Sequence, residues 1–328
     1  MLAAGAAIPR LSRGAVVRLS RFLGLCAYFG SGKLRRIAAA NLDIAFGDSL
    51  SQLEKRAINK ASFQSFSLVM LDLFWFSRDT KARLEAYLSF DPSFDHVFKG
   101  GAGINVTAHL GNWEVMNLGC GVKGYPLTTV VMPIRNAFAD RELNRIRRET
   151  GVEISHRSGA IRRIMRALRA GRGAALVVDQ NTLPQEGGVF VPFFGLPVPV
   201  SRVTGALWAK TNARIVAVWC VPDGKGHYTA YARPQEFASD ETLTIEQIVA
   251  RVTLGLEDII RQHPQFWLWS YKRWRFYREE DPIEKYPFYA EEVEHYWRIR
   301  MSTQMPRDAA LADLKARQAV ADKAAGKR

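Results

Sequence analysis

Hydrophobic positions in the first hundred residues recur every three or four places, which predicts helices. Residues 34–46 and 49–76 both show this spacing, and Ser51 with Glu54 has the spacing of a capping box at the start of the second stretch. The second stretch carries a broad apolar stripe, which would suit core packing or a groove for lipid chains. The stripe consists of Phe63, Phe66, Val69, Met70, Leu73 and Phe74.

From residue 101 onward, short apolar runs alternate with longer stretches of helical spacing. Strands are expected over 101–109, 127–133, 173–180, 211–222 and 227–237, and helices over 112–122, 140–151, 160–171 and 245–264. This alternation predicts an α/β fold with a mixed sheet flanked by helices, and such sheets carry their functional groups at the carboxyl ends of the strands. His109 and Asp179 stand at two such ends.

The pattern divides the chain into four parts. We expect a membrane-association segment over 1–33, a helical region over 34–100, the α/β domain over 101–300 and a polar tail over 301–328. The tail is rich in Ala, Lys, Asp and Arg with few large apolar residues, which is typical of a solvated segment or a lone surface helix.

The N-terminal segment predicts an amphipathic helix that begins near Pro9. Its most apolar piece, residues 22–29, is too short to span a bilayer, and we predict no signal peptide. Two placements fit equally: a helix lying in anionic headgroups, or a helix packed on the rest of the protein. One side would carry Arg10, Arg13, Arg18 and Arg21, and mostly opposite them would lie Val16, Leu19, Phe22, Leu23 and Cys26.

Charge and cysteine content restrict the partners and the compartment. Lysine and arginine number 46 against 32 acidic residues, so the formal charge of +14 favours an anionic partner: phosphates, nucleic acid or an acidic protein. Cys26, Cys120 and Cys220 are scattered and odd in number, which suggests neither a disulfide framework nor a zinc site. A reducing, cytosol-facing location fits best.

The stretch "VTAHLGNWEV", residues 106–115, holds the strongest candidate chemistry. If His109 lies in the strand-to-helix loop and Glu114 in the first helical turn, Gly111 would let the two converge. The carboxylate would then orient the imidazole, and the pair could remove a proton from a hydroxyl. Alternatively, Glu114 only complements the helix dipole and His109 is a satisfied polar end to the strand.

Five blocks in the same order resemble the lipid A biosynthesis acyltransferase family of bacteria, which is related to glycerolipid and phosphatidylinositol mannoside acyltransferases. "HLGNWE", a His and a Glu separated by four residues, is similar to its first block. The others are "MPIRN" with Arg135, "RIRRETG" with Arg145 and Arg147, "ALRAGRGAALVVDQN" with Asp179 and Gln180, and the proline-rich "VFVPFFGLPVPVS". The likeness covers roughly residues 34–274.

The resemblance implies a glycerolipid-acyltransferase-like fold and transfer of a fatty acyl chain from a thioester to a hydroxyl of a glycolipid or lysolipid. His109 would be the general base and Glu114 its orienting partner. The oxyanion donor would be a backbone N–H or Arg135. Substrate contacts are expected from Arg135, Arg145, Arg147, Asp179 and Gln180. There is no GxSxG elbow, and Cys120 lies inside a predicted helix, so no covalent intermediate, metal or cofactor is expected.

The resemblance also implies the partners: a lipid A precursor as acceptor, acyl-carrier protein or acyl-CoA as donor, and the cytoplasmic face of the bacterial inner membrane. The sequence leaves open a non-catalytic lipid-binding protein on the same fold, and acylation of another lysophospholipid or an ornithine-type lipid. The basic aromatic string at 266–277 raises nucleic-acid binding as a lower-ranked alternative. In this string the chain has Tyr271, where many relatives carry a histidine.

Overall fold

The computed structural model describes residues 5, 7–131, 137–156, 159–237 and 243–304. Its main feature is a seven-stranded sheet with the order β1-β9-β8-β2-β5-β3-β4. Strands β8, β2, β5, β3 and β4 run parallel, whereas β9 is antiparallel to β8 and β1 is parallel to β9. These strands are β1 (Leu88–Phe90), β2 (Ile104–Thr107), β3 (Leu127–Val131), β4 (Glu153–His156), β5 (Gly173–Val177), β8 (Ile215–Pro222) and β9 (Tyr228–Gln235).

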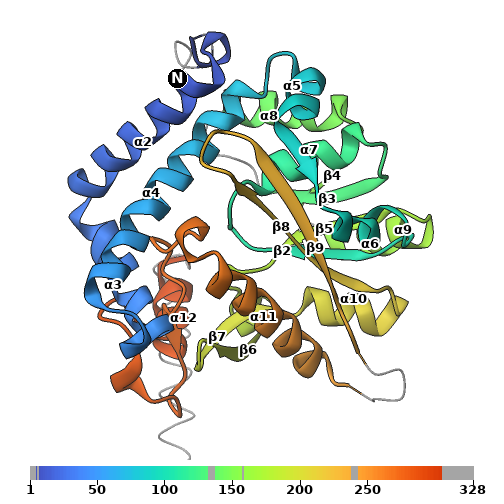
Figure 1. Cartoon of the computed structure of the whole chain (residues 1–328). Coiled ribbons are helices and arrows are strands. Elements are labelled where there is room, and N and C mark those ends of the chain that lie inside the picture. The colour runs from blue at the N-terminus through green and yellow to red at the C-terminus, as the bar shows by residue number, and fades with distance from the viewer. Residues whose placement is uncertain (1–4, 6, 132–136, 157–158, 238–242, 305–328) are drawn as a thin grey trace, which may run out of the picture.

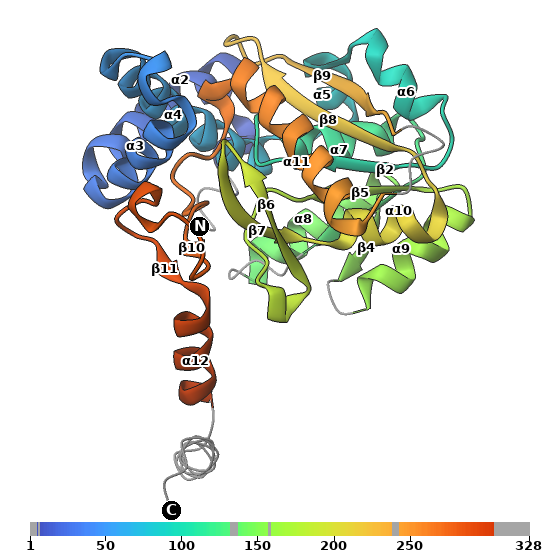
Figure 2. The same ribbon diagram turned by 90° about the horizontal axis from the view of Figure 1, so that it is seen from below.

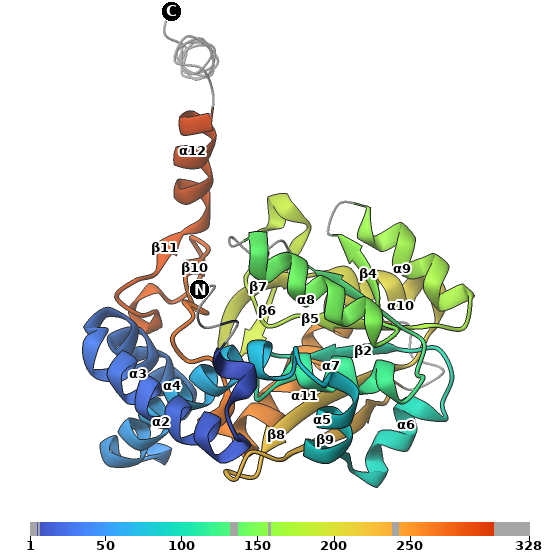
Figure 3. The same ribbon diagram turned by 90° about the horizontal axis from the view of Figure 1, so that it is seen from above.

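Helices cover both faces of this sheet, as Figures 1 and 3 show. The α-helices of the described residues, not all of which touch the sheet, are α2 (Arg13–Gly30), α3 (Gly32–Phe46), α4 (Gln52–Trp75), α5 (Thr80–Tyr87), α6 (Asp95–Phe98), α7 (Trp113–Val122), α8 (Ala137–Glu149), α9 (Ala160–Arg169), α10 (Val203–Thr211), α11 (Ile245–Gln262) and α12 (Val293–Gln304). The mixed sheet flanked by helices is therefore confirmed. The capping box at the start of α4 is also present, because Ser51 and Glu54 bond each other's backbone N–H groups.

Side-chain alternation along the central strands builds two cores, one on each face of the sheet. On β2, Ile104 and Val106 belong to the core that includes α9 and α11. The other core contains residues of α7, β8 and β9 together with α2 and α4. The residues of β2 that alternate with Ile104 and Val106 are Asn105 and Thr107, and they face α7.

Five strands named below were not expected from the sequence. The proline-rich block folds into an antiparallel hairpin of β6 (Gly188–Phe193) and β7 (Leu196–Ser201), and the edge strand β4 follows α8. A short parallel pair, β10 (Phe276–Tyr277) with β11 (Glu291–Glu292), leads into α12. Helix α12 projects away from the rest of the molecule (Figure 2). The expected tail lies almost entirely outside the described residues.

Helix α2 packs along α4 on the side of the molecule away from β3 and β4 (Figure 1). Its buried residues are Arg13, Val16, Val17, Ser20 and Gly24, whereas Phe22, Leu23 and Cys26 are exposed beside Arg18 and Arg21. The predicted basic face is therefore interrupted at Arg13, which is buried, and the predicted apolar face is divided between buried Val16 and exposed Phe22. Among the described residues, no helix is long and apolar enough to cross a membrane.

The reason Arg13 is buried lies on α4. Its guanidinium makes two hydrogen bonds to Asp72, which is 1% exposed. Asp72 also accepts hydrogen bonds from Tyr228 at 2.6 Å and from the side-chain amide of Asn112 at 3.1 Å. Asn112 is the N-cap of α7, where its side chain accepts from the backbone N–H of Val115. One carboxylate thus joins α2, α4, β9 and the start of α7.

Candidate active site

The loop between β2 and α7 is held by backbone hydrogen bonds on both sides. The N–H of Gly111 donates to the carbonyl of Phe266, and the N–H of Asn112 donates to the carbonyl of Cys220. Gly111 has φ +60°, and a Cβ built on it would lie 1.8 Å from the Cys220 carbonyl oxygen. Only glycine fits this approach, and the loop presents His109 at a fixed place above the sheet.

Strand register brings His109 next to Asp179. Thr107 on β2 is paired with Val177 on β5, and each functional residue lies two positions after its strand. The imidazole Nδ1 lies 2.7 Å from one carboxylate oxygen of Asp179, and the backbone N–H of His109 donates to the other at 2.9 Å. The indole N–H of Trp267 donates to that second oxygen as well, at 2.9 Å.

Electrostatics of this pair favour a basic imidazole. Burial lowers the pKa of His109, but the charge and hydrogen bond of Asp179, with a smaller contribution from Glu114, outweigh it and leave that pKa raised. Burial likewise raises the pKa of Asp179, and its interactions with His109 and Trp267 reverse the direction, so this pKa is lowered. When Nδ1–H donates a hydrogen bond to Asp179, the neutral ring keeps a lone pair on Nε2, and this nitrogen can act as a base.

Glu114 does not have the contact that the sequence analysis gave it. Its carboxylate receives two hydrogen bonds from Arg147 on α8, at 2.5 and 3.2 Å, instead of one from the imidazole. The first turn of α7 directs this side chain toward α8, and the carboxylate that meets the imidazole comes from the neighbouring strand. Glu114 therefore acts on His109 through its charge and not through a hydrogen bond.

The remaining candidate residues fall in three places. Gln180 is exposed, and its side-chain nitrogen lies 3.4 Å from the Nε2 of His109. Arg147 is 7% exposed and faces Glu114. Arg145 lies on the solvent side of α8, in ion pairs with Glu142 and Glu149. Arg135 lies outside the described residues.

Two residues that the sequence analysis did not single out as partners support this site. Trp267 holds Asp179, as described above, and the hydroxyl of Tyr271 accepts a hydrogen bond from the backbone N–H of Asn181 at 3.0 Å. Tyr271 thus fixes the loop that carries Gln180. The sequence does hint that His109 and Asp179 are partners, because both lie two positions after a strand. The hint requires knowing that these two strands are neighbours in the sheet, which the sequence did not tell.

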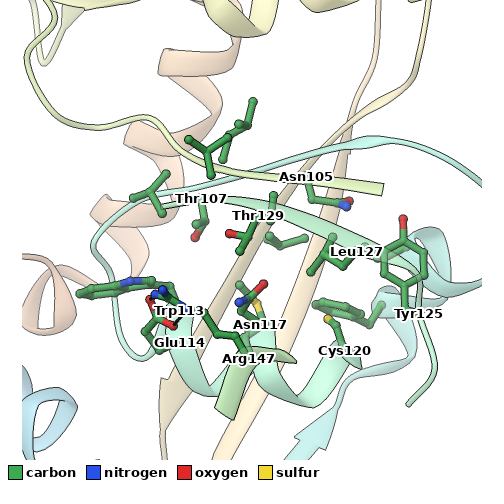
Figure 4. Close-up of a pocket in the computed structure, with 18 residues that line it drawn as sticks. Asn105, Thr107, Trp113, Glu114, Asn117, Cys120, Tyr125, Leu127, Thr129 and Arg147 are labelled. Carbon is green, nitrogen blue, oxygen red and sulfur yellow. Dashed lines mark hydrogen bonds and ion pairs between the residues drawn. The ribbon is translucent and has the colours of Figure 1, made fainter. Parts of the chain in front are cut away.

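A slot runs between α7 and the sheet (Figure 4), and Trp113, one of its lining residues, connects it to His109. The Trp113 ring packs edge-on against the His109 ring with centroids 4.7 Å apart, and Trp113, Glu114 and Arg147 line one end of the slot. The space between atoms is about 570 Å³, open solvent included. Most of the other lining residues are apolar: Phe94, Val97, Met116, Cys120, Leu127, Val130, Ala175, Leu176, Val177 and Val218.

The two buried cysteines are not suited to act as nucleophiles. Cys120 and Cys220 are buried, and burial raises the pKa of the Cys120 thiol to about 12. A thiol with so high a pKa is protonated at neutral pH and inert. Within the described ranges, no group of three or more His, Cys, Asp or Glu side chains could hold a metal ion.

Comparison with known proteins identifies the family. Residues 1–276 match the family of bacterial lipid A biosynthesis acyltransferases, and the chain belongs to this family. Over 154 residues the chain is 25% identical to lipid A biosynthesis acyltransferase 2 of Shigella flexneri. This similarity covers 47% of the chain and 48% of that protein, so the chain spans about half the length of the curated relative it matches.

Proposed function

We propose that the protein transfers a fatty acyl chain from a thioester donor, acyl-carrier protein or acyl-CoA, to a hydroxyl of a membrane glycolipid, with a lipid A precursor as the acceptor. The observation that carries this proposal is the His109–Asp179 pair, whose imidazole contacts Trp113 at one end of a mostly apolar slot. Family membership supports the same reaction class.

In this reaction, Nε2 of His109 removes the proton from the acceptor hydroxyl as its oxygen attacks the thioester carbonyl carbon. Asp179 keeps Nδ1 protonated and stabilises the imidazolium that forms. The C–S bond breaks when the tetrahedral intermediate collapses, and the imidazolium returns the proton to the departing thiolate. His109 thus serves as base and then as acid in one transfer.

The oxyanion needs a hydrogen-bond donor, and the backbone N–H groups that follow His109 are already engaged. The backbone N–H groups of Leu110, Gly111 and Asn112 already donate to carbonyl oxygens of Ala108, Phe266 and Cys220. We assign the role to side chains near Nε2, with the amide of Gln180 as the nearest one described. Arg147, held by Glu114, places a cation at the same end of the slot, where it would attract the thioester oxygen.

The slot suits the acyl chain of the donor because it is mostly apolar and one end is lined by Trp113, which packs against the imidazole. The acceptor then approaches from the solvent side, where 20% of the His109 side chain is exposed. Association with the cytoplasmic face of the inner membrane would bring this side to the lipid. The exposed phenylalanines and arginines of α2 support such association.

The test is an assay of acyl transfer with purified full-length protein. Labelled dodecanoyl thioesters of carrier protein and of CoA are incubated with a panel of lipid A precursors and lysolipids. The products are separated and identified by mass spectrometry. We expect one acceptor class to gain one acyl chain. His109→Ala should lower the rate by about 10²–10⁴-fold, the contribution of a general base.

The control variant is His227→Ala, because His227 is half-buried on the β8–β9 connection, where it contacts Ser89, and lies outside the site. Full transfer by His109→Ala would refute the mechanism and would assign the catalysis to another group. Lipid analysis of cells with and without the gene then names the acceptor. An unchanged lipid profile together with no transfer in vitro would refute the proposed reaction.

A further inference from the structure

The slot contains more polar surface than an alkyl chain needs. On the face of β2 that meets α7, the strand carries Asn105 and Thr107, whereas its opposite face carries Ile104 and Val106. Asn105 is 3% exposed, and its amide has no hydrogen bond of normal geometry apart from an interaction with the Tyr125 hydroxyl. A buried amide with so few partners is costly, because it has lost its hydrogen bonds to water.

A second amide enters the slot from the opposite wall. Asn117 on α7 is 9% exposed, lines the slot, and its side-chain oxygen has no partner. It lies three residues after Glu114, which corresponds to about 4.5 Å along the helix axis. Figure 4 shows Asn117 between the end marked by Trp113 and Glu114 and the end marked by Tyr125 and Cys120.

Two threonines add hydroxyls to the same stretch. Thr107 on β2 and Thr129 on β3 line the slot, and Figure 4 shows both on the wall across from Asn117. At the inner end the Tyr125 hydroxyl interacts with Asn105 and makes a long hydrogen bond, 3.4 Å, to the carbonyl of Gly101. The polar groups therefore form a strip within the slot and are not confined to its mouth.

We propose that the slot selects a fatty acyl chain that bears a hydroxyl group near its thioester end, with Asn117 as the residue that recognises it. A hydroxyl both donates and accepts, and a carboxamide offers a matching acceptor and donor. This inference rests on the proposed acyl transfer. It adds the chemical class of the donor chain.

The direction of the slot favours the acyl chain over the rest of the donor. The thioester carbon must lie next to His109, and the arm of the carrier must return to a macromolecule or nucleotide in solvent. The Asn117 amide lies inside, between helix and sheet, where the chain alone can reach. A site built to bond a hydroxyl discriminates against the analogue that lacks it, because the amide is then buried unpaired.

The test compares donors of equal length. Dodecanoyl, 2-hydroxydodecanoyl and 3-hydroxydodecanoyl thioesters of CoA and of acyl-carrier protein are titrated into the full-length protein by calorimetry, with CoA and the carrier alone as references. One hydroxylated chain should bind about tenfold more tightly than dodecanoyl on the same carrier, the gain expected from a satisfied hydrogen bond. The same donors are then compared by kcat/KM.

Asn117→Leu should bring the ratio of hydroxylated to plain affinity to about one, while plain dodecanoyl binds as well as before or better. Asn117→Ala provides a second variant should the first not fold, as judged by thermal unfolding. Met116→Leu is the matched control, since it also lines the slot but offers no hydrogen bond, and it should keep the wild-type ratio. A merely structural asparagine would change all affinities together and leave the ratio intact.

Three results would overturn the inference: plain dodecanoyl bound at least as well as both hydroxylated chains by the wild-type protein, a wild-type ratio kept in the asparagine variants, or equal weakening of unacylated carrier by Asn117→Leu. Each of these leaves acyl transfer itself intact. Failure of every thioester to bind or react would instead refute the proposed function.

Discussion

Three acidic and basic side chains set the properties of His109, and they act over different distances. Asp179 touches the ring and fixes its tautomer, whereas Glu114 contributes only charge because Arg147 occupies its oxygens. A histidine with a raised pKa is a stronger base, although a larger fraction of it is protonated at neutral pH. Both consequences can be measured.

The first prediction concerns the pH dependence of kcat/KM. The base must be neutral, so the rate should fall as pH is lowered through the pKa of His109, which lies above 6.5. In Asp179→Asn the favourable charge is lost and burial remains, so this limb should move to lower pH. The plateau should also fall by about 10²–10⁴-fold, since an asparagine amide can hold the wrong tautomer. A limb that stays in place would show that Asp179 does not control the base.

The second prediction concerns stability. The pKa of His109 is raised above 6.5, so its pairing stabilises the folded state fully below pH 6.5 and less as pH rises through the folded value. The pKa of Asp179 is lowered below 3.8, so its contribution is present above pH 3.8 and lost on further acidification. The stability deficit of Asp179→Asn should therefore be largest near pH 5 and smaller at pH 9.

Urea unfolding at pH 5, 7 and 9 checks this. The lost hydrogen bond from Trp267 adds a deficit that does not vary with pH, so some destabilisation should remain at pH 9. A deficit that grew from pH 5 to pH 9 would contradict the assigned directions of the two pKa shifts.

At the level of elements, the loop from β2 to α7 depends on one glycine. Gly111→Ala would combine a left-handed backbone conformation with a Cβ at 1.8 Å from a carbonyl oxygen, so we expect a loss of about 2–5 kcal/mol in unfolding free energy. Gly124→Ala is the matched control, because Gly124 has φ +77° but open space around it. It should cost only about 1–2 kcal/mol. Equal losses in the two variants would show that the contact with Cys220 is unimportant.

Periodicity alone predicted most elements of the α/β domain, including the strands that end before His109 and Asp179. It could not predict that these strands are neighbours, because register is set by long-range packing. Proximity in sequence therefore favoured Glu114 over Asp179 as the partner of the histidine. The β6–β7 hairpin was missed because prolines are rare in strands and its pattern lacks clear alternation.

The burial of Arg13 on α2 was missed for a similar reason. An arginine on a helix normally indicates a solvent face, and the presence of a buried partner for Arg13 on α4 could not be read from the local pattern. The true outward face combines Arg18 and Arg21 with Phe22 and, seven residues further along the same side, Phe29.

At the scale of the whole molecule, this outward face yields a prediction about membranes. Phe22 and Phe29 are 62% and 68% exposed, large values for phenylalanine on a folded surface. We expect the protein to sediment with anionic phospholipid vesicles, and Phe22→Ser with Phe29→Ser should weaken this binding about tenfold or more. Leu254→Ser, an exposed apolar residue on α11, is the control. Unchanged sedimentation of the double variant would exclude α2 as the docking element.

The Asp72 carboxylate connects two distant helices. It accepts hydrogen bonds from Arg13, the first residue of α2, and from Asn112 at the first turn of α7, the turn that carries Trp113 and Glu114. The position of α2 and the end of the slot at Trp113 therefore depend on the same buried side chain.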